Sequence, residues 1–241
     1  MLEVVAVPVL TDNYVWLIHD DETGETAAVD PSVAEPVLEA VAAKGWTLTQ
    51  ILNTHWHPDH TGGNAGIQQA TGAPITAPAE AERVSKVDRV VQEGDRVTVA
   101  GRDAIVWDIP AHTAGHIAYY FPDDGMIFVG DTMFAMGCGR LFEGTAEQMF
   151  ANLQRIAALP EGVRIYCGHE YTLANAAFAA HAEPDNPAIR EREAATARLR
   201  EAGTITLPTT VAEERATNPF VRAAGVAEFA ALRSDKDRFR S

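Results

Sequence analysis

One short loop of the chain carries four potential metal ligands. It reads Thr54-His55-Trp56-His57-Pro58-Asp59-His60 and directly follows an apolar run that ends at Asn53. Imidazole nitrogens and carboxylate oxygens suit zinc or a similar divalent cation, and ligands on one loop need little extra ordering of the chain. Gly62 and Gly63 let the loop turn tightly. A solvated histidine-rich turn is the alternative, but ligands clustered this closely favour a metal site.

Three further potential ligands each follow a predicted strand. His112 comes after the run 104–109, Asp131 follows the run 127–129, and His169 follows the run 164–167. Any one of them alone is more typical of a cap or turn residue. Together with the first loop, however, they make a set sufficient for two metal sites and one bridging carboxylate.

Hydrophobic periodicity predicts an α/β chain in which helices dominate beyond residue 145, with a domain boundary near residue 170. Its first half combines strands with helices, and beyond residue 145 helices are interrupted by one strand at 163–167. The expected strands are 2–9, 13–19, 25–30, a run ending at Leu52, 97–99, 104–109, 117–121 and 126–129; the expected helices are 36–44, 64–70, 145–158, 171–182, 187–202 and 224–238. The predicted domains are a metal-binding catalytic domain, 1–170, and a helical domain, 171–241.

Composition limits the class of protein. The chain has 241 residues, 46% of them hydrophobic and 22% charged, which suits an autonomously folding protein of one or two domains. A formal net charge of −15 argues against nucleic acid as a partner. No apolar run reaches the ~18 residues of a membrane span, so no membrane association is expected.

The compartment follows from the first residues and the cysteines. The segment MLEVVAVPVL carries Glu3 where a signal peptide has basic residues, so it is expected to be a strand. Cys138 and Cys167 are too few for a disulfide framework and are expected to be buried thiols in a cytoplasmic protein. Nothing in the sequence points to an obligate partner, and a monomer is expected.

The pattern H-x-H-x-D-H at 55–60, followed in order by His112, Asp131 and His169, resembles the metallo-β-lactamase superfamily. The resemblance covers residues 1 to about 170 and implies a four-layer αβ/βα sandwich with metals at one edge. Further strings resemble the glyoxalase II family, the hydroxyacylglutathione hydrolases, along the whole chain. They are Gly137-Cys138-Gly139-Arg140-Leu141-Phe142-Glu143-Gly144-Thr145, Tyr166-Cys167-Gly168-His169-Glu170-Tyr171-Thr172, Asn218-Pro219-Phe220 and Arg233-Ser234-Asp235-Lys236-Asp237.

The resemblance implies two divalent metal ions, zinc first, with iron or manganese accepted by the same donors. One ion would be held by His55, His57 and His112, and the other by Asp59, His60 and His169, with Asp131 bridging. Asp59 and Asp131 are thereby expected to be catalytic. A hydroxide held between the ions would attack the thioester, because two cations lower the pKa of water from ~15.7 toward about 7.

The implied reaction hydrolyses S-D-lactoylglutathione, or another S-(2-hydroxyacyl)glutathione, to the hydroxy acid and glutathione, the second step of methylglyoxal detoxification. The thiolate is a good leaving group, which reduces the need for a strong general acid. By resemblance, the substrate contacts are Arg140, Phe142, His169, Tyr171, Arg233 and Lys236. The cations among them would meet the glycine carboxylate of glutathione.

Two of these substrate residues depart from the family pattern. Phe142 stands where a tyrosine is usual, and the lost hydroxyl contact would cost ~0.5 to 1.5 kcal/mol. Arg140 replaces the lysine of many relatives, which keeps the charge but changes the donor geometry. A solvated helix face is the alternative role for Arg233 and Lys236. His116 is expected to support the ligands by hydrogen bonding, while His19 and His181 are expected to be structural or surface groups.

Other functions explain the sequence less well. A glutathione-linked persulfide dioxygenase with one iron shares much of the ligand pattern but lacks the glyoxalase-type C-terminal segment. A non-catalytic metal-binding domain would leave Asp131 and the second site unexplained. A redox di-iron module ordinarily carries glutamate where His57 stands.

Overall fold

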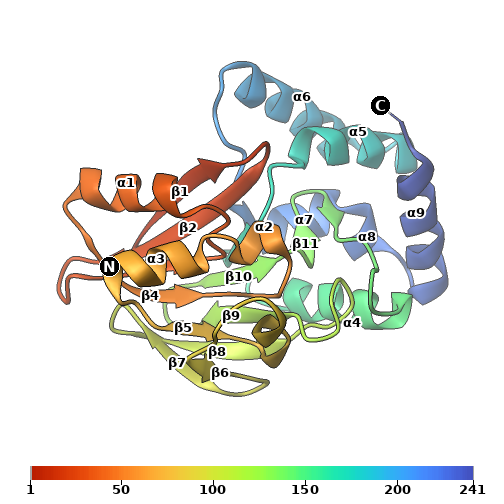
Figure 1. Ribbon diagram of the computed structural model, residues 1–241. Coiled ribbons are helices and arrows are strands. Elements are labelled where there is room, and N and C mark those ends of the chain that lie inside the picture. The colour runs from red at the N-terminus through yellow and green to blue at the C-terminus, as the bar shows by residue number, and fades with distance from the viewer. Residues whose placement is uncertain (1, 241) are drawn as a thin grey trace.

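The computed structural model describes residues 2–240 and contains two six-stranded sheets (Figure 1). The first sheet has its strands in chain order, with antiparallel pairing from β1 to β3 and parallel pairing from β3 to β6. Its members are β1 (Leu2–Val9), β2 (Asn13–Asp20), β3 (Glu25–Val29), β4 (Thr47–Leu52), β5 (Ile75–Ala77) and β6 (Arg89–Val90).

The second sheet has the order β14-β13-β10-β9-β8-β7. Only β10 and β13 run parallel in it; the other neighbours are antiparallel. Its members are β7 (Arg96–Val99), β8 (Arg102–Asp108), β9 (Ile117–Phe121), β10 (Met126–Gly130), β13 (Arg164–Cys167) and β14 (Thr209–Thr210). A separate small hairpin consists of β11 (Met133–Phe134) and β12 (Gly137–Cys138).

Alternating side chains of β2 show how the layers are built. Trp16 and Ile18 enter the core shared with the second sheet, whereas Val15 and Leu17 enter the core beneath α1 (Ala34–Lys44) and α3 (Asn64–Thr71). On the other side, α4 (Ala146–Ala157) adds its apolar residues to the core of the second sheet. In Figure 1, α1 and α3 lie above β4, and β7 to β9 lie below it. The expected four-layer αβ/βα sandwich is confirmed.

The C-terminal third is helical, as expected, and gathers at one end of the sandwich (Figure 1). It contains α5 (Thr172–Ala182), α6 (Pro187–Glu201), α7 (Val211–Thr217), α8 (Pro219–Arg222) and α9 (Val226–Arg238). No helix was predicted for 203–223, where α7 and α8 lie. Yet Thr210 and Glu213 form a capping box, the signal that begins α7.

Short elements were also missed, because two to five residues carry no readable period. These include β5, β6, β11, β12, β14, α2 (Pro58–Thr61) and the 3₁₀ helix η1 (Ala79–Arg83). The longer elements agree with the expected ranges to within a few residues; α1, for example, begins at Ala34 and not at residue 36. Among residues 2–240, no helix is long and apolar enough to cross a membrane.

Buried polar groups of the C-terminal helices hold the β11–β12 hairpin. Asn218 donates to the backbone oxygen of Gly137 (2.9 Å), and Glu214 accepts from the amide of Met136 (2.9 Å). Asn175 donates to the backbone oxygen of Ala135 (3.1 Å). Since the hairpin directly follows Asp131, these contacts connect the helical region to the ligand-bearing edge of the sheets.

Candidate metal centre and substrate cavity

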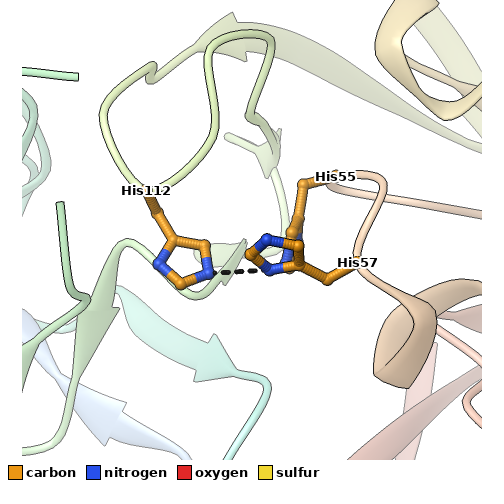
Figure 2. A group of neighbouring side chains, drawn as sticks. All are labelled: His55, His57 and His112. Carbon is orange, nitrogen blue, oxygen red and sulfur yellow. Dashed lines mark hydrogen bonds between the residues drawn. The ribbon is translucent and has the colours of Figure 1, made fainter. Parts of the chain in front are cut away.

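The first group of expected ligands consists of three imidazoles. Nε2 of His55 and Nε2 of His112 each lie 3.1 Å from Nδ1 of His57. His112 reaches this point from a different loop than His55 and His57 (Figure 2). The three ligand atoms lie within 4.8 Å of one another, close enough to share one ion.

The second group combines one carboxylate with two imidazoles. Nε2 of His60 and Nε2 of His169 lie 3.5 Å and 3.4 Å from Oδ2 of Asp59. These ligand atoms also lie within 4.8 Å of one another. The structure therefore brings together all six of the expected nonbridging ligands, in two groups of three.

Asp131 lies between the two groups. Its Oδ2 is 3.4 Å from Nε2 of His112 and 3.2 Å from Nε2 of His169. Its Oδ1 is 3.4 Å from Nε2 of His60. One carboxylate thus faces ligands of both groups, which is the geometry that a bridging ligand needs.

Strand pairing explains why ligands distant in sequence meet. Asp131 and His169 follow β10 and β13, whose ends pair in parallel at Gly130 and Cys167. The loop 53–60 follows β4, and the amide of Ile117, at the start of β9, donates to the backbone oxygen of Thr54 (2.9 Å). This bond ties the two sheets together at the ligand edge.

Each of four imidazoles is oriented by a second contact on its other nitrogen. Nδ1 of His112 donates to the backbone oxygen of Arg140 (3.0 Å), and Nδ1 of His55 lies 3.0 Å from the Thr54 hydroxyl. The remaining two face carboxylates: His60 Nδ1 to Asp30 (3.1 Å) and His169 Nδ1 to Asp12 (2.9 Å). Such contacts fix which nitrogen faces the metal.

Three residues that support the expected ligands were not predicted from the sequence. Asp30 is buried and also accepts from the amide and hydroxyl of Thr54, each at 2.7 Å. Asn13 donates to the carboxylate of Asp59 (3.1 Å), and Asp12 faces His169. Asp30 could have been found, because it follows β3 directly, as Asp131 follows β10. Asp12 lies in the turn between β1 and β2, and Asn13 is the first residue of β2; neither carries a comparable signal.

The three histidines that are not expected ligands have the surroundings expected for supporting, structural or surface groups. His116 is fully buried, stacks on His55 at 4.5 Å and accepts from the amide of Asp131 (3.2 Å), so it supports the ligands. His19 is buried against Trp46 at 4.1 Å, and His181 is on the surface. Cys138 and Cys167 are free and buried, as expected.

The chemistry of the donor set fits two cations. Among residues 2–240, Nε2 of His60 and Oδ1 of Asp131 are buried without a hydrogen-bond partner, although both face the centre. Burial lowers the pKa of His55 well below its usual value and also lowers the pKa of His112, which keeps both imidazoles neutral as ligands must be.

The ionised carboxylate of Asp131 is stabilised by neighbouring positive charge. Burial alone would raise the pKa of Asp131, but the charges of His60 and His169 outweigh it and hold that pKa well below its usual range. Conversely, burial opposes protonation of His169, yet chiefly Asp131 raises its pKa to about 10. A divalent cation between these groups would supply that positive charge.

Glycine is required where the backbone meets the centre. A Cβ added to Gly168 would lie 2.6 Å from Cε1 of His60 and 2.7 Å from Oδ1 of Asp131. A Cβ on Gly139 would lie 1.9 Å from the backbone oxygen of Asp131. Only glycine lets these segments pack so closely against the ligands.

A cavity of about 480 Å³ opens from the centre toward the C-terminal helices. The six expected substrate residues all line it. Its lining consists of His57, Asp59, His112, Asp131, Phe134, Cys138, Arg140, Phe142, His169, Tyr171, Ala174, Asn175, Arg233 and Lys236. Metal ligands form one part of this lining, here called the metal end, and the cations Arg140, Arg233 and Lys236 form another, here called the cationic end.

The aromatic lining lies beside the ligands. The ring of Tyr171 stacks on His169 at 4.6 Å, and burial raises the pKa of its hydroxyl. The ring of Phe142 is 60% exposed and lies edge-on to His57 (5.7 Å) and His112 (5.2 Å).

The cations differ in how they are held. Arg140 is 68% exposed, and its Nε lies 4.0 Å from Asp237. Arg233 is only 7% exposed and donates to the backbone oxygen of Cys138 (2.8 Å) and to Asp237 (3.0 Å). Lys236 is half-buried and donates to the backbone oxygen of Ala174 (2.9 Å). The alternative of a solvated helix face is therefore wrong for Arg233.

Comparison with known proteins gives the family. A sequence model described as "Metallo-beta-lactamase superfamily" matches residues 10–169, and one described as "Hydroxyacylglutathione hydrolase C-terminus" matches residues 170–239. The hydroxyacylglutathione hydrolase of Methylococcus capsulatus is 48% identical over 100% of both chains. That of Erythrobacter litoralis is 50% identical over 99% of this chain and 100% of its own. The chain belongs to the hydroxyacylglutathione hydrolase family.

Solved structures agree on the fold. ETHE1 from Myxococcus xanthus is 26% identical to this chain and superimposes with a TM-score of 0.74. The match covers 98% of this chain and 90% of the ETHE1 chain. The B3 metallo-beta-lactamase BLEG-1 has a TM-score of 0.70 at 19% identity, covering 92% of this chain and 100% of its own. TTHA1623, solved in a di-iron-bound form, has a TM-score of 0.66 at 24% identity, covering 90% and 99%.

The C-terminal match bears on the main alternative. The main alternative was a persulfide dioxygenase, a class of enzyme that is expected to lack the glyoxalase-type C-terminal segment. Here that segment matches the C-terminal model of the hydroxyacylglutathione hydrolase family over residues 170–239. The family assignment therefore includes α9, the helix that brings Arg233 and Lys236 to the cavity.

Proposed function

We propose that the chain hydrolyses S-D-lactoylglutathione and related S-(2-hydroxyacyl)glutathione thioesters to the hydroxy acid and glutathione. One observation carries the proposal: a single cavity is lined both by the histidine-aspartate centre and by three cations. The metal centre suits attack on the thioester, and the cations suit the anionic end of the tripeptide.

The proposed centre is binuclear. His55, His57 and His112 would hold one divalent ion and Asp59, His60 and His169 the other, with Asp131 shared, which makes Asp59 and Asp131 the catalytic carboxylates. When bound, such ions lower the pKa of water and polarise a carbonyl, the two requirements of thioester hydrolysis. Zinc is our first candidate, although iron and manganese accept the same donors.

The protein's own side chains would orient the substrate. Arg140, Arg233 and Lys236 would bind the glycine carboxylate, far from the reacting carbonyl. Tyr171 and Phe142 would flank the thioester beside His169 and His57, the ligands that their rings contact. Because Phe142 has no hydroxyl, it would contribute apolar contact and no hydrogen bond.

We further propose a division of labour between residues 1–170, which would carry the metal chemistry, and 171–241, the substrate-binding domain, which would supply Tyr171, Arg233 and Lys236, while Arg140 and Phe142 of the first domain complete the substrate contacts. The two free buried thiols support a reducing compartment such as the cytoplasm. We propose that the chain acts as a monomer, since one chain supplies all seven expected metal ligands and the three cations that would bind substrate.

Thiol release tests the proposed activity directly. Purified protein is assayed with S-D-lactoylglutathione, other glutathione thioesters and a small thioester that lacks the tripeptide, alongside metal analysis. We expect fast glutathione release, two metal equivalents and poor turnover of the small thioester. Oxygen consumption with glutathione persulfide, without thioester turnover, would contradict the proposal and favour a dioxygenase.

A further inference from the structure

The loop that carries His112 is held from outside by a buried carboxylate. Glu80 lies in η1 and is only 9% exposed. Its Oε1 accepts from the hydroxyl of Thr113 (2.6 Å), and its Oε2 accepts from the amide of Gly115 (2.6 Å). These distances are typical of strong hydrogen bonds to an ionised group.

A second carboxylate reaches the same loop from another direction. Oε2 of Glu143 accepts from the amide of Ala114 (2.8 Å), while its Oε1 lies 3.4 Å from Arg83. Three consecutive residues, 113–115, thus each donate to a glutamate that is distant in sequence. Glu80 is the more buried of the two and makes two of the three contacts.

The backbone is shaped to fit Glu80. A Cβ added to Gly115 would lie 2.9 Å from Oε2 and 3.0 Å from Cγ of Glu80, so glycine allows the close approach. Just before these residues, His112 donates from Nδ1 to the backbone oxygen of Arg140 and turns Nε2 toward His57 and Asp131. Moving the loop would therefore move the one ligand of the first group that does not come from the loop 54–60.

We propose that Glu80 is a positioning residue for the first metal site: through Thr113 and Gly115 it fixes the loop that presents His112. The inference rests on the proposed role of His112 as a metal ligand. Glu80 touches neither the cavity nor any ligand atom, so it would act only through the loop. The ligands of the second group do not belong to that loop, and their ion should not depend on Glu80.

Glu80→Gln is the sharpest variant. It keeps the size of the side chain but removes its negative charge, and an amide can accept only through its oxygen, so one of the two hydrogen bonds that Glu80 accepts is lost and the other is weakened. Glu82→Gln is the matched control, because Glu82 lies in the same η1 helix and is exposed. Zn²⁺ is titrated into metal-free protein against a competing chelator, which resolves the two equivalents without reference to catalysis.

We expect Glu80→Gln to weaken one Zn²⁺ equivalent by about 10 to 100-fold and to leave the other unchanged. The Glu82→Gln protein should bind both ions like the wild type. Equal weakening of both equivalents, with a lower Tm of the metal-free protein, would assign Glu80 to folding and overturn the proposal. Unchanged binding of both equivalents would overturn it as well.

Thr113→Val keeps the inference testable even if Glu80→Gln does not fold. It removes one hydroxyl donor to Glu80 and should weaken the same Zn²⁺ equivalent, by less than Glu80→Gln does. In the double variant the two effects should be less than additive, because both changes break the same contact. Additive effects, or a Thr113→Val protein with unaltered Zn²⁺ binding, would contradict the proposal. Failure of the thioester assay in wild-type protein that binds two Zn²⁺ would instead contradict the proposed activity.

Discussion

At the metal end of the cavity the ligands are fixed by further contacts, whereas at the cationic end two of the three side chains are held more loosely. His60 and His169 face the centre with one nitrogen and a carboxylate with the other. Arg140, by contrast, is mostly exposed, and Lys236 is held by one backbone oxygen. The difference separates the two tasks of the cavity: reacting groups must be preorganised, but contacts far from the reaction need only bind.

The largest effect is expected at the carboxylate that both ligand groups share. Asp131→Ala should reduce the metal content to one equivalent or fewer and lower kcat by about 100-fold or more, since even supporting residues of metal sites cost about 10 to 100-fold. Elemental analysis and thioester turnover check this. His116→Ala, which removes the acceptor for the Asp131 amide and the ring that stacks on His55 but no expected ligand, should have a smaller effect. Two metals and near-normal turnover in Asp131→Ala would contradict the shared-ligand assignment.

A backbone change at the metal end should be almost as severe. Gly168→Ala places a methyl group against His60 and Asp131. Displacing these ligands by as little as ~1 Å should reduce kcat by about 100-fold and release metal. Gly162→Ala is the matched control, because a Cβ there meets nothing within 4 Å. If Gly168→Ala retained both metals and its kcat, the metal end would not be as rigid as we infer.

The cationic end should respond in KM and not in kcat. Lys236→Ala removes a charged contact of about 1.5 to 3 kcal/mol, so we expect KM for S-D-lactoylglutathione to rise by roughly 10 to 100-fold, less at high salt. Metal content should stay the same. Arg238→Ala, an exposed cation of α9 outside the cavity, is the control. An equal defect with a small thioester would indicate a structural role for Lys236.

The smallest effect is a pH dependence of binding. Burial, followed by the neighbouring charge of Arg233, lowers the pKa of Lys236 to about 8, with Cys138 and Asp237 opposing the shift. Lys236 is therefore charged below pH 8 and loses its charge as the pH rises through that value. KM for the glutathione thioester should rise over the same interval, while Lys236→Arg should remove this rise, because arginine stays charged. An identical KM profile in both proteins would show that Lys236 does not bind the carboxylate.

The two ends of the cavity also differed in how far the sequence could predict them. The seven expected ligands, which the structure brings together, could be named from the sequence, because each lies shortly after an apolar strand, where the fold leaves little freedom. The support that Asp12 and Asn13 give could not be predicted, because it depends on how the β1–β2 turn packs on the centre. Likewise, the i, i+3 spacing of Arg233 and Lys236 predicted a shared face but not that Arg233 would be buried against Cys138. Such contacts depend on tertiary packing, which local periodicity does not encode.

The parallel pairing of β10 with β13 has a consequence for how such proteins diversify. The pairing of Gly130 with Cys167 sets the spacing of Asp131 and His169 through backbone hydrogen bonds, independently of the chain between the two strands. Changes of length in that intervening segment, for instance at the exposed turn 160–162, would leave the two ligands where they are. A lineage can therefore rebuild the surroundings of the cavity by insertion and deletion while it inherits an unchanged reactive centre.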